Sequence, residues 1–226
     1  MTLLDAAQIR APIAGESGKR LDRLEVFAEI DSTNSHLMSQ SAPLPGRFRV
    51  ALAEHQTAGR GRREKRWQSP ASCGLCMSMA YTFARPRLDL SAVSLAAGVG
   101  VAAALESVGA NGVGLKWPND IVVRDGKLGG ILTEVRQRHD RQATIVVGVG
   151  VNIDLQNHGH TIEVSPGIGR VSDLASCGVH IESRSALSAT LIEYLFNTLV
   201  EFEAGGFAAF ADDYLRYDWL KGQSIT

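Results

Sequence analysis

Two apolar runs separated by a tight-turn dipeptide place the strongest constraint on how this chain folds. They occur in the segment DIVVRDGKLGGILTEVRQ, residues 120–137, where the dipeptide is Asp125 followed by Gly126. An Asp-Gly pair between two apolar runs is a strong signal for a β-hairpin with a two-residue turn. Another apolar run, ATIVVGVGVNI, follows at 143–153, and its Gly148 and Gly150 predict that another backbone or a ligand approaches closely. The region therefore predicts consecutive antiparallel strands.

Further strands and helices are predicted on both sides of this region. The predicted strands cover residues 24–30, 47–56, 73–83 and 113–117. Two helices are predicted to begin near residues 31 and 91, and two more are predicted at 183–206 and 207–220. The apolar stripe of the longest helix advances in steps of three and four residues, through Leu187, Leu191, Tyr194, Leu195, Leu199 and Phe202. The pattern predicts an α+β fold, with a mixed, mostly antiparallel sheet and helices packed on one side.

The composition is that of an ordinary soluble globular protein. The 226 residues are 45% apolar and 21% charged, and this length holds one large domain or two small ones. The N-terminus lacks the basic region and long apolar run of a signal peptide. The apolar run from Leu90 to Leu105 is shorter than the ~20 residues of a membrane helix, and its Ala and Gly content suits a helix packed closely on a sheet. We therefore expect a cytoplasmic protein without a membrane partner.

The cysteines give little support for a metal or redox centre. Cys73 and Cys76 have the CxxC spacing, but a second pair is missing and the segment is predicted as a strand, on which positions three apart point to opposite faces. We expect small buried thiols instead.

A basic stretch, HQTAGRGRREKRWQSP at 55–70, concentrates positive charge on one short segment. It holds one acid, Glu64, among the cations Arg60, Arg62, Arg63, Lys65 and Arg66. The pattern alone fits a solvated loop, a nucleic-acid contact or a small anionic ligand, since arginine forks match phosphate and carboxylate oxygens. The net charge of −1 argues against a dedicated DNA-binding protein, because such domains are usually strongly basic.

Two other segments carry polar groups beside apolar strands. KWPND at 116–120 is a good β-turn by pattern, and Lys127 follows the hairpin turn just before Gly129 and Gly130. A lone hairpin lysine is more often solvent-exposed, but one next to a glycine pair can reach a ligand against bare backbone. DSTN at 31–34 reads as a helix N-cap, or as hydroxyl partners for a polar head group.

Taken together and in this order, four segments resemble the catalytic domain of the biotin protein ligases. They are DSTN, HQTAGRGRREKRW, KWPNDI with GKLGGIL, and VVGVGVNI, and the resemblance runs from about Leu24 to Leu220. It implies a fold similar to class II synthetases and a reaction in which biotin and ATP give biotinyl-5′-adenylate and pyrophosphate. A lysine of a carboxylase's biotin carboxyl carrier domain then takes the biotin. A lipoate or octanoate ligase or transferase of the same fold is the alternative.

The resemblance also implies roles for individual residues. Lys127 lies between the biotin carboxylate and the α-phosphate, Arg60 and Arg62 fold the loop over the adenylate, and Asp120 helps to activate the acceptor lysine. The implied catalytic residues are Lys127, Arg62 and Asp120. The implied biotin-binding residues are Ser32, Thr33, Gln56, Gly59, Arg60, Arg62, Lys127 and Gly130. The implied ATP-binding residues are Arg60, Arg62, Trp67, Asn119, Asp120, Lys127 and Asn152. Mg²⁺ is expected with ATP, without a dedicated protein site for the metal.

The sequence departs from the family pattern in three ways. The family loop usually reads GRGRRGR, whereas Glu64 and Lys65 replace its last glycine and arginine here, so a ligand-binding protein with impaired catalysis is a further hypothesis. The residues before the first strand are too few for a winged helix-turn-helix, so we expect a monofunctional member without a DNA partner. We expect a catalytic domain at 1–218, with 219–226 entering an otherwise absent SH3-like domain. Homodimers are expected to form, if at all, through an exposed sheet edge.

Overall fold

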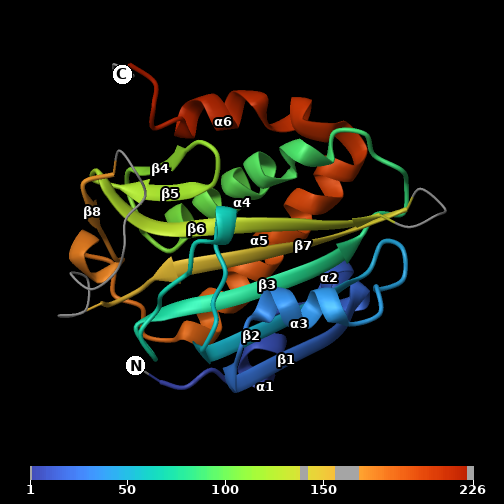
Figure 1. Ribbon diagram of the computed structural model, residues 1–226, viewed down its shortest axis with the longest axis horizontal. Helices are drawn as coiled ribbons and strands as arrows, with labels where there is room; N and C mark the ends of the chain where they lie inside the picture. Colours follow the sequence, from blue (N-terminus) through green and yellow to red (C-terminus); the bar gives the residue numbers. More distant parts are fainter. Residues whose placement is uncertain (1, 138–141, 156–167, 223–226) are drawn as a thin grey trace.

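One mixed sheet organises the protein in the computed structural model, which describes residues 2–137, 142–155 and 168–222 (Figure 1). Within these residues the strand order is β1-β2-β3-β7-β6-β5-β4, with β8 beside β6. The β1–β2 and β6–β8 pairs are parallel and all the others antiparallel, which confirms the predicted mixed, mostly antiparallel sheet. The strands are β1 (Leu21–Ile30), β2 (Phe48–Gln56), β3 (Gly74–Thr82), β4 (Val113–Lys116), β5 (Asp120–Val123), β6 (Gly126–Gln137), β7 (Ala143–Asn152) and β8 (Arg170–Val171).

The helices agree with the predicted ones and add two near the N-terminus. The α-helices are α1 (Ala6–Arg10), α2 (Gly15–Arg20), α3 (Thr33–Ser39), α4 (Val93–Ser107), α5 (Arg184–Gly205) and α6 (Ala211–Tyr217). Short 3₁₀ turns are η1 (Arg62–Glu64), η2 (Leu90–Ala92), η4 (Ala175–Cys177) and η5 (Gly206–Phe210). No element was predicted for residues 1–20, yet the Asp5 side chain caps α1 by accepting hydrogen bonds from the backbone N–H groups of Ala7 and Gln8.

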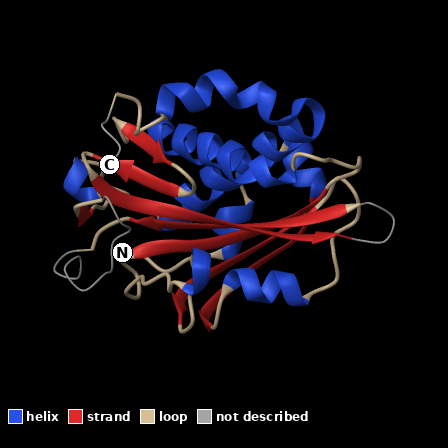
Figure 2. Ribbon diagram, turned by 45° about the horizontal axis from the view of Figure 1, so that its top comes forward, coloured by secondary structure: helices blue, strands red, loops and turns tan. Residues whose placement is uncertain are grey.

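The two faces of the sheet are covered unequally. Most helices gather on one side (Figure 2), where α1, α2 and α4 pack against α5, whereas α3 packs on the opposite face against β2, β3 and β7 (Figure 1). Strand alternation explains this division, because Met77 and Met79 of β3 enter the main core while Ala80 packs with Leu37 of α3. The predicted one-sided helical layer therefore holds for every helix except α3.

The long helix α5 buries most of its predicted stripe. Leu191, Leu195 and Leu199 are fully buried, whereas Tyr194 is 37% exposed. The prediction for Tyr194 is wrong because Ile192 and Phe196 are buried as well, which shifts the buried stripe away from Tyr194. At about 100° per residue, Tyr194 falls on the flank of that stripe.

Helix α4 packs closely on two neighbours. The stretch Leu90–Ser107 has a mean hydropathy of 1.6, and by length and composition it could cross a membrane. However, 61% of this stretch is buried inside the protein. A Cβ on Gly98 would lie 3.2 Å from the side chain of Leu115 in β4, and one on Gly100 would lie 2.1 Å from Oγ1 of Thr198 in α5. The small residues therefore bring α4 against α5 as well as against the predicted sheet.

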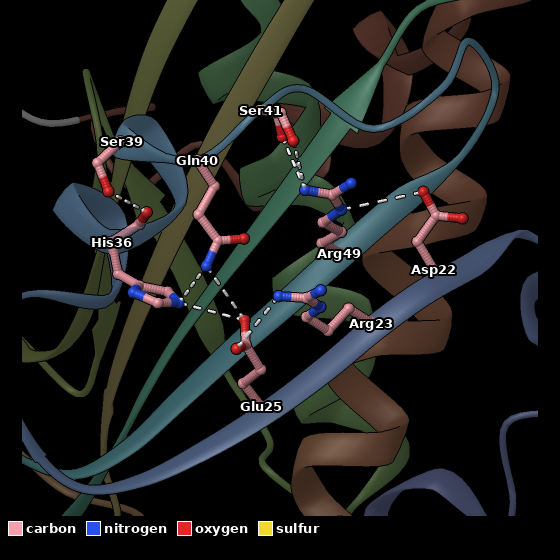
Figure 3. Close-up of polar contacts among 8 residues, drawn as sticks. All are labelled: Asp22, Arg23, Glu25, His36, Ser39, Gln40, Ser41 and Arg49. Carbon is pink, nitrogen blue, oxygen red and sulfur yellow. Dashed lines mark hydrogen bonds and ion pairs between the residues drawn. The ribbon is translucent and has the colours of Figure 1, made fainter.

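The edge strand β1 is joined to α3 by polar side chains (Figure 3). The carboxylate of Glu25 on β1 contacts Nε2 of His36 at 3.2 Å and Nε2 of Gln40 at 3.5 Å, and Arg23 lies 3.8 Å from the same carboxylate. These contacts fix α3 over the first strands, on the face opposite α5.

The opposite edge strand, β4, is covered by the chain that follows α6. The backbone N–H of Trp219 donates to the carbonyl of Leu115, and a Cβ on Gly114 would lie 3.2 Å from the Trp219 side chain. Trp219 thus packs on the predicted catalytic domain. Residues 223–226, expected to enter a further domain, lie outside the described residues.

Candidate active site

A cavity of about 310 Å³ opens on the face of the sheet that carries α3. It brings together residues from the start of α3, the basic loop, the WPND turn and the inner strands. Among the predicted site residues, those lining it are Ser32, Thr33, Gln56, Arg60, Arg62, Trp67, Asn119, Asp120, Lys127 and Gly130. Its size lies at the lower end of the range for small-molecule sites.

The position of α3 against the sheet depends on a glycine in β7. Ser32 is the N-cap of α3, and its side chain accepts a hydrogen bond from the backbone of Ser35. A Cβ on Gly148 would fall 2.3 Å from Oδ1 of Asn34, so only glycine lets the first turn of the helix lie this close. The predicted close approach at Gly148 is therefore made by a side chain.

Hydroxyl and amide groups form a polar floor at this end of the cavity. Thr33 donates its backbone N–H to Oε1 of Gln56 at 2.8 Å, and its hydroxyl lies 2.7 Å from that of Ser78. Ser78 in turn donates to Oδ1 of Asn34 at 2.6 Å. Groups of this kind both donate and accept, and they suit a ligand that carries donors and acceptors together.

Sequence reasoning missed Ser78 and used Asn34 only as a possible helix cap. Both line the cavity and are buried, at 0% and 3% exposure. The available signal was strand alternation, since Ser78 lies between Met77 and Met79 and therefore faces away from the core that they enter. A hydroxyl at such a position marks a buried polar site.

The basic loop forms a small hairpin whose stem is joined by backbone hydrogen bonds. The N–H of Trp67 donates to the carbonyl of Gly59 at 2.9 Å, and that of Gly61 donates to Lys65 at 2.7 Å. A Cβ on Gly59 would lie 2.5 Å from the carbonyl oxygen of Trp67. Gly59 is absent from the cavity lining. The close approach that the structure shows at Gly59 is to the other side of the loop, and the expected approach to a ligand stays a prediction.

The arginines of the loop differ in their surroundings. Arg60 is paired in a two-pronged contact with Glu134, with both N···O distances at 2.9 Å. The side chain of Arg62 is exposed and makes no hydrogen bond or ion pair within the described part of the chain. The side chain of Glu64 lies outside what the structure describes, so its expected effect on the loop stays a prediction.

Trp67 lies against bare backbone at the centre of the sheet. A Cβ on Gly150 would fall 2.4 Å from Cε2 of the indole, and one on Gly130 would lie 3.7 Å from Cζ3. The close approach predicted at Gly150 is therefore made by this indole. The ring nitrogen of Trp67 is buried without a hydrogen-bond partner, which leaves one donor inside the site.

Lys127 faces the cavity because the pairing of β5 and β6 contains a bulge. Val122 pairs with Lys127 and Ile121 with Gly129, so Leu128 is an extra residue on β6. Leu128 and Ile131 both enter the main core. The extra residue reverses the alternation, and Lys127 therefore lies on the same face as Gly130.

Lys127 is paired at the cavity with Asp120. Its Nζ lies 2.6 Å from Oδ1 of Asp120, whose side chain is 9% exposed. The neighbouring Asn119 holds the WPND turn to β6, accepting from the N–H of Ile131 and donating its amide to the Ile131 carbonyl, both at 2.9 Å. The structure thus fixes a lysine and a carboxylate side by side.

Asn152 lies outside the cavity and supports a strand of the site, so its expected contact with ATP stays a prediction. It is 2% exposed and is absent from the cavity lining. Its amide donates to the backbone carbonyls of Lys127 at 3.3 Å and Ser172 at 3.0 Å. Asn152 therefore holds β6, the strand that carries Lys127, from the neighbouring strand β7.

Cys73 and Cys76 are buried free thiols, as predicted. Cys76 lines the cavity, and burial raises its pKa to about 11, so the thiol is neutral near pH 7. Within the described ranges no group of three or more His, Cys, Asp or Glu side chains is arranged to hold a metal ion.

Known proteins match both the sequence and the fold. The profile of the Biotin/lipoate A/B protein ligase family matches residues 26–152. The bifunctional ligase/repressor BirA of Escherichia coli is 33% identical over 216 residues, covering 96% of this chain and 64% of its own length. The biotin–[acetyl-CoA-carboxylase] ligase of Mycobacterium tuberculosis is 34% identical over 204 residues, covering 88% and 72%.

A solved structure gives the same assignment. The biotin protein ligase from Aquifex aeolicus, in complex with biotin and ATP, superposes with a TM-score of 0.65 at 25% identity, covering 89% of this chain and 79% of its own. This chain spans less than two thirds of the length of the Escherichia coli relative. The match of a family profile over more than half of the chain, and of relatives along nearly all of it, shows that the chain belongs to the biotin/lipoate A/B protein ligase family, among the biotin protein ligases.

Proposed function

We propose that this chain is an ATP-dependent biotin protein ligase. It activates biotin to biotinyl-5′-adenylate and then transfers biotin to a lysine of a carboxylase's biotin carboxyl carrier domain. The observation that carries the proposal is one cavity in which a polar floor, the Lys127–Asp120 pair and the arginine-rich loop converge. The relatives named as ligases and the Aquifex complex with biotin and ATP support it.

The first step joins two anions. A carboxylate oxygen of biotin attacks the α-phosphorus of ATP, the bond from that phosphorus to the bridging oxygen breaks, and pyrophosphate leaves. Fixed positive charge lowers the barrier by offsetting the repulsion and stabilising the charge that develops on phosphate. Lys127 and Arg62 are our candidates, because Lys127 is held inside the cavity and Arg62 has no competing partner within the described residues.

In the second step the acceptor lysine displaces AMP. Its neutral amine attacks the acyl carbon, loses a proton and forms an amide as the bond to the phosphate oxygen breaks. Asp120 is our candidate for orienting the amine and favouring loss of its proton, since its carboxylate already accepts a contact from an ammonium group at 2.6 Å. The loop excludes water from the anhydride between the two steps.

The chemistry of the polar floor favours biotin over lipoate or octanoate. A ureido ring offers two N–H donors and one carbonyl acceptor, and Thr33, Gln56 and Ser78 offer matching groups. A dithiolane or an alkyl end offers no matching donors and acceptors, so it would form no such hydrogen bonds with these groups. The floor therefore supports biotin as the acid that is activated.

Mg²⁺ is proposed to enter with ATP. The described residues provide no cluster of metal ligands, and this ion is commonly bound through substrate phosphates while it keeps several waters. When bound, it would offset the charge of the leaving pyrophosphate. Asp120, a carboxylate in the cavity lining, would help to hold it.

We also propose a cytoplasmic location and no DNA partner for the described domain.

Pairing of two copies through β1 is a further proposal. Within the described residues β1 pairs only with β2, so its outer edge offers free backbone groups. Charged side chains along this edge oppose uncontrolled pairing. Sedimentation of the purified chain at several concentrations, with and without biotin and ATP, would measure such pairing directly.

Biotin-dependent exchange between ATP and pyrophosphate tests the proposed function. Lipoate and octanoate serve as parallel substrates, and an assay without acid gives the background. Exchange with biotin alone supports the proposal. Exchange with lipoate or octanoate instead assigns the alternative activity, and no exchange with any acid contradicts adenylate formation by this chain.

A further inference from the structure

Glu134 of β6 joins two parts of the site that lie far apart in the sequence. Its two oxygens contact Nη1 and Nη2 of Arg60 in the basic loop, each at 2.9 Å. One of these oxygens also accepts from Nδ2 of Asn34 at 3.0 Å. Glu134 therefore links the stem of the loop to the first turn of α3.

The contact to Asn34 continues into the polar floor. Oδ1 of Asn34 accepts from Ser78, whose hydroxyl lies 2.7 Å from that of Thr33. Asn34 accepts from Ser78 with Oδ1 and donates to Glu134 with Nδ2, so its amide is oriented by the polar floor and in turn orients the Glu134 carboxylate. The carboxylate of Glu134 is thus held in place before it meets Arg60.

The charge of the loop makes such a contact necessary. Cations crowd the loop, and their mutual repulsion favours an open, mobile segment. The Glu134 side chain is 21% exposed, so solvent screens it less than a surface carboxylate. A two-pronged contact to a guanidinium is also among the stronger and more directional hydrogen-bonded pairs.

We propose that Glu134 is a positioning residue for the basic loop: its carboxylate orients the guanidinium of Arg60 and so holds the loop stem over the cavity before any ligand binds. Loop placement rests on the contacts above, whereas its effect on catalysis rests on the proposed function. Without this contact, the loop opens more often and closes less reliably over the adenylate.

The Glu134→Gln variant tests the positioning role. Glutamine keeps an oxygen for Asn34 but loses the charge that pairs with Arg60. A matched control is Glu25→Gln, since Glu25 is similarly exposed at 25% and contacts His36 of α3 (Figure 3). Glu25 does not line the cavity. Both variants remove one partly buried carboxylate beside α3.

Trypsin provides a readout that does not depend on activity. The full chain without ligands is cleaved for short times, and mass spectrometry separates cuts within residues 60–66 from cuts elsewhere. We expect Glu134→Gln to raise loop cleavage by about tenfold or more, which corresponds to about 1.4 kcal/mol in the opening equilibrium, while the control stays at the wild-type rate. Equal loop cleavage in all three proteins would overturn the proposal.

A double-mutant comparison decides the case in which Glu134→Gln raises cleavage along the whole chain. Cuts after Arg62, Arg63 and Lys65 are then compared in Arg60→Gln, Glu134→Gln and the double variant. If Glu134 acts through Arg60, the double variant is cleaved no faster than the faster single variant. Effects that multiply would show that the two residues act separately, and the proposal would be wrong.

Kinetics test the consequence for the reaction. In the exchange assay, Glu134→Gln should raise the KM for biotin and ATP and increase release of the adenylate, while the maximal rate at saturating substrates falls much less. Glu134→Asp, which keeps the charge, should restore part of the effect. If the wild-type chain activates no acid at all, the proposed function fails, but the trypsin comparison still decides the role of Glu134.

Discussion

The ammonium nitrogen of Lys127 lies 2.6 Å from Oδ1 of Asp120, directly beside the bulge at Leu128. The two charges compensate each other at a site where Asp120 is nearly buried, at 6% exposure. A ligand carboxylate or phosphate that approaches Lys127 must therefore share it with Asp120. Changing either residue therefore affects both catalysis and stability, and the two effects can be measured separately.

Lys127→Ala should lower biotin-dependent exchange by about 100-fold or more, because it removes fixed charge from the reacting anions. It should also lower the free energy of unfolding, since it leaves the Asp120 carboxylate buried without its partner. Adding Asp120→Asn should restore stability in urea unfolding but not activity. Lys19→Ala, at an exposed ion pair, is the control. Exchange close to the wild-type rate in Lys127→Ala would contradict the assignment.

Arg62→Gly should release more adenylate into solution without changing stability appreciably, because the Arg62 side chain is exposed and makes no hydrogen bond or ion pair within the described residues. The measurement is the amount of free biotinyl-5′-adenylate after rapid filtration, with the melting temperature measured alongside. Arg85→Gly changes an exposed arginine outside the cavity and serves as control. Equal release from wild type and Arg62→Gly would rule out a closing role for Arg62.

Gly150→Ala should displace the indole of Trp67, because the added Cβ would fall 2.4 Å from Cε2. We expect a loss of about 1–3 kcal/mol in the free energy of unfolding from overpacking, together with weaker binding of biotin and ATP. Gly169→Ala is the matched control, since a Cβ there meets nothing within 4 Å. Urea unfolding and the exchange assay check both effects. Identical behaviour of the two variants would mean that Trp67 moves aside without cost.

Cys76→Ala should reduce the loss of stability at high pH. Burial raises the pKa of Cys76 from its ordinary 9.0 to about 11. From pH 9 to 11 the unfolded chain therefore releases this proton while the folded chain keeps it. The contribution to stability is thus complete below pH 9 and declines as pH rises to 11, by about 1.4 kcal/mol per pH unit at most. Tyr81 also has a raised pKa but is common to both proteins, so the difference between their urea midpoints reports on Cys76. Parallel pH profiles would contradict the expected shift.

Much of the fold follows from local signals. The hairpin at Asp125, the alternating strands and the spacing of Leu191, Leu195 and Leu199 each depend on neighbours in the sequence, and the structure confirms those elements. The predicted Asp-Gly turn is wrong by one position, because Gly126 pairs with Val123 and the two turn residues, both with positive φ, are Arg124 and Asp125. The short helices α1 and α2 escaped prediction because their stability comes from packing on α5, and helices of this length give little periodic signal.

The candidate site divides in the same way. Ser32, Thr33, Gln56 and Lys127 lie in short motifs, and the cavity brings them together. Gly59 and Asn152 lie outside the cavity lining, and their expected ligand contacts stay predictions. A motif identifies a residue without saying whether it faces the ligand or the loop and strand that support it.

The sequence by itself determined the succession of strands and helices, the family, and most of the side chains that meet in the cavity, since hydrophobic spacing and short motifs carry that information. Only the tertiary structure decided which face these side chains occupy. The extra residue Leu128 turns Lys127 away from the core, and the contact between Arg60 and Glu134 joins positions 74 residues apart in the sequence. Both depend on how β6 pairs with its neighbours, which no stretch of the sequence specifies locally.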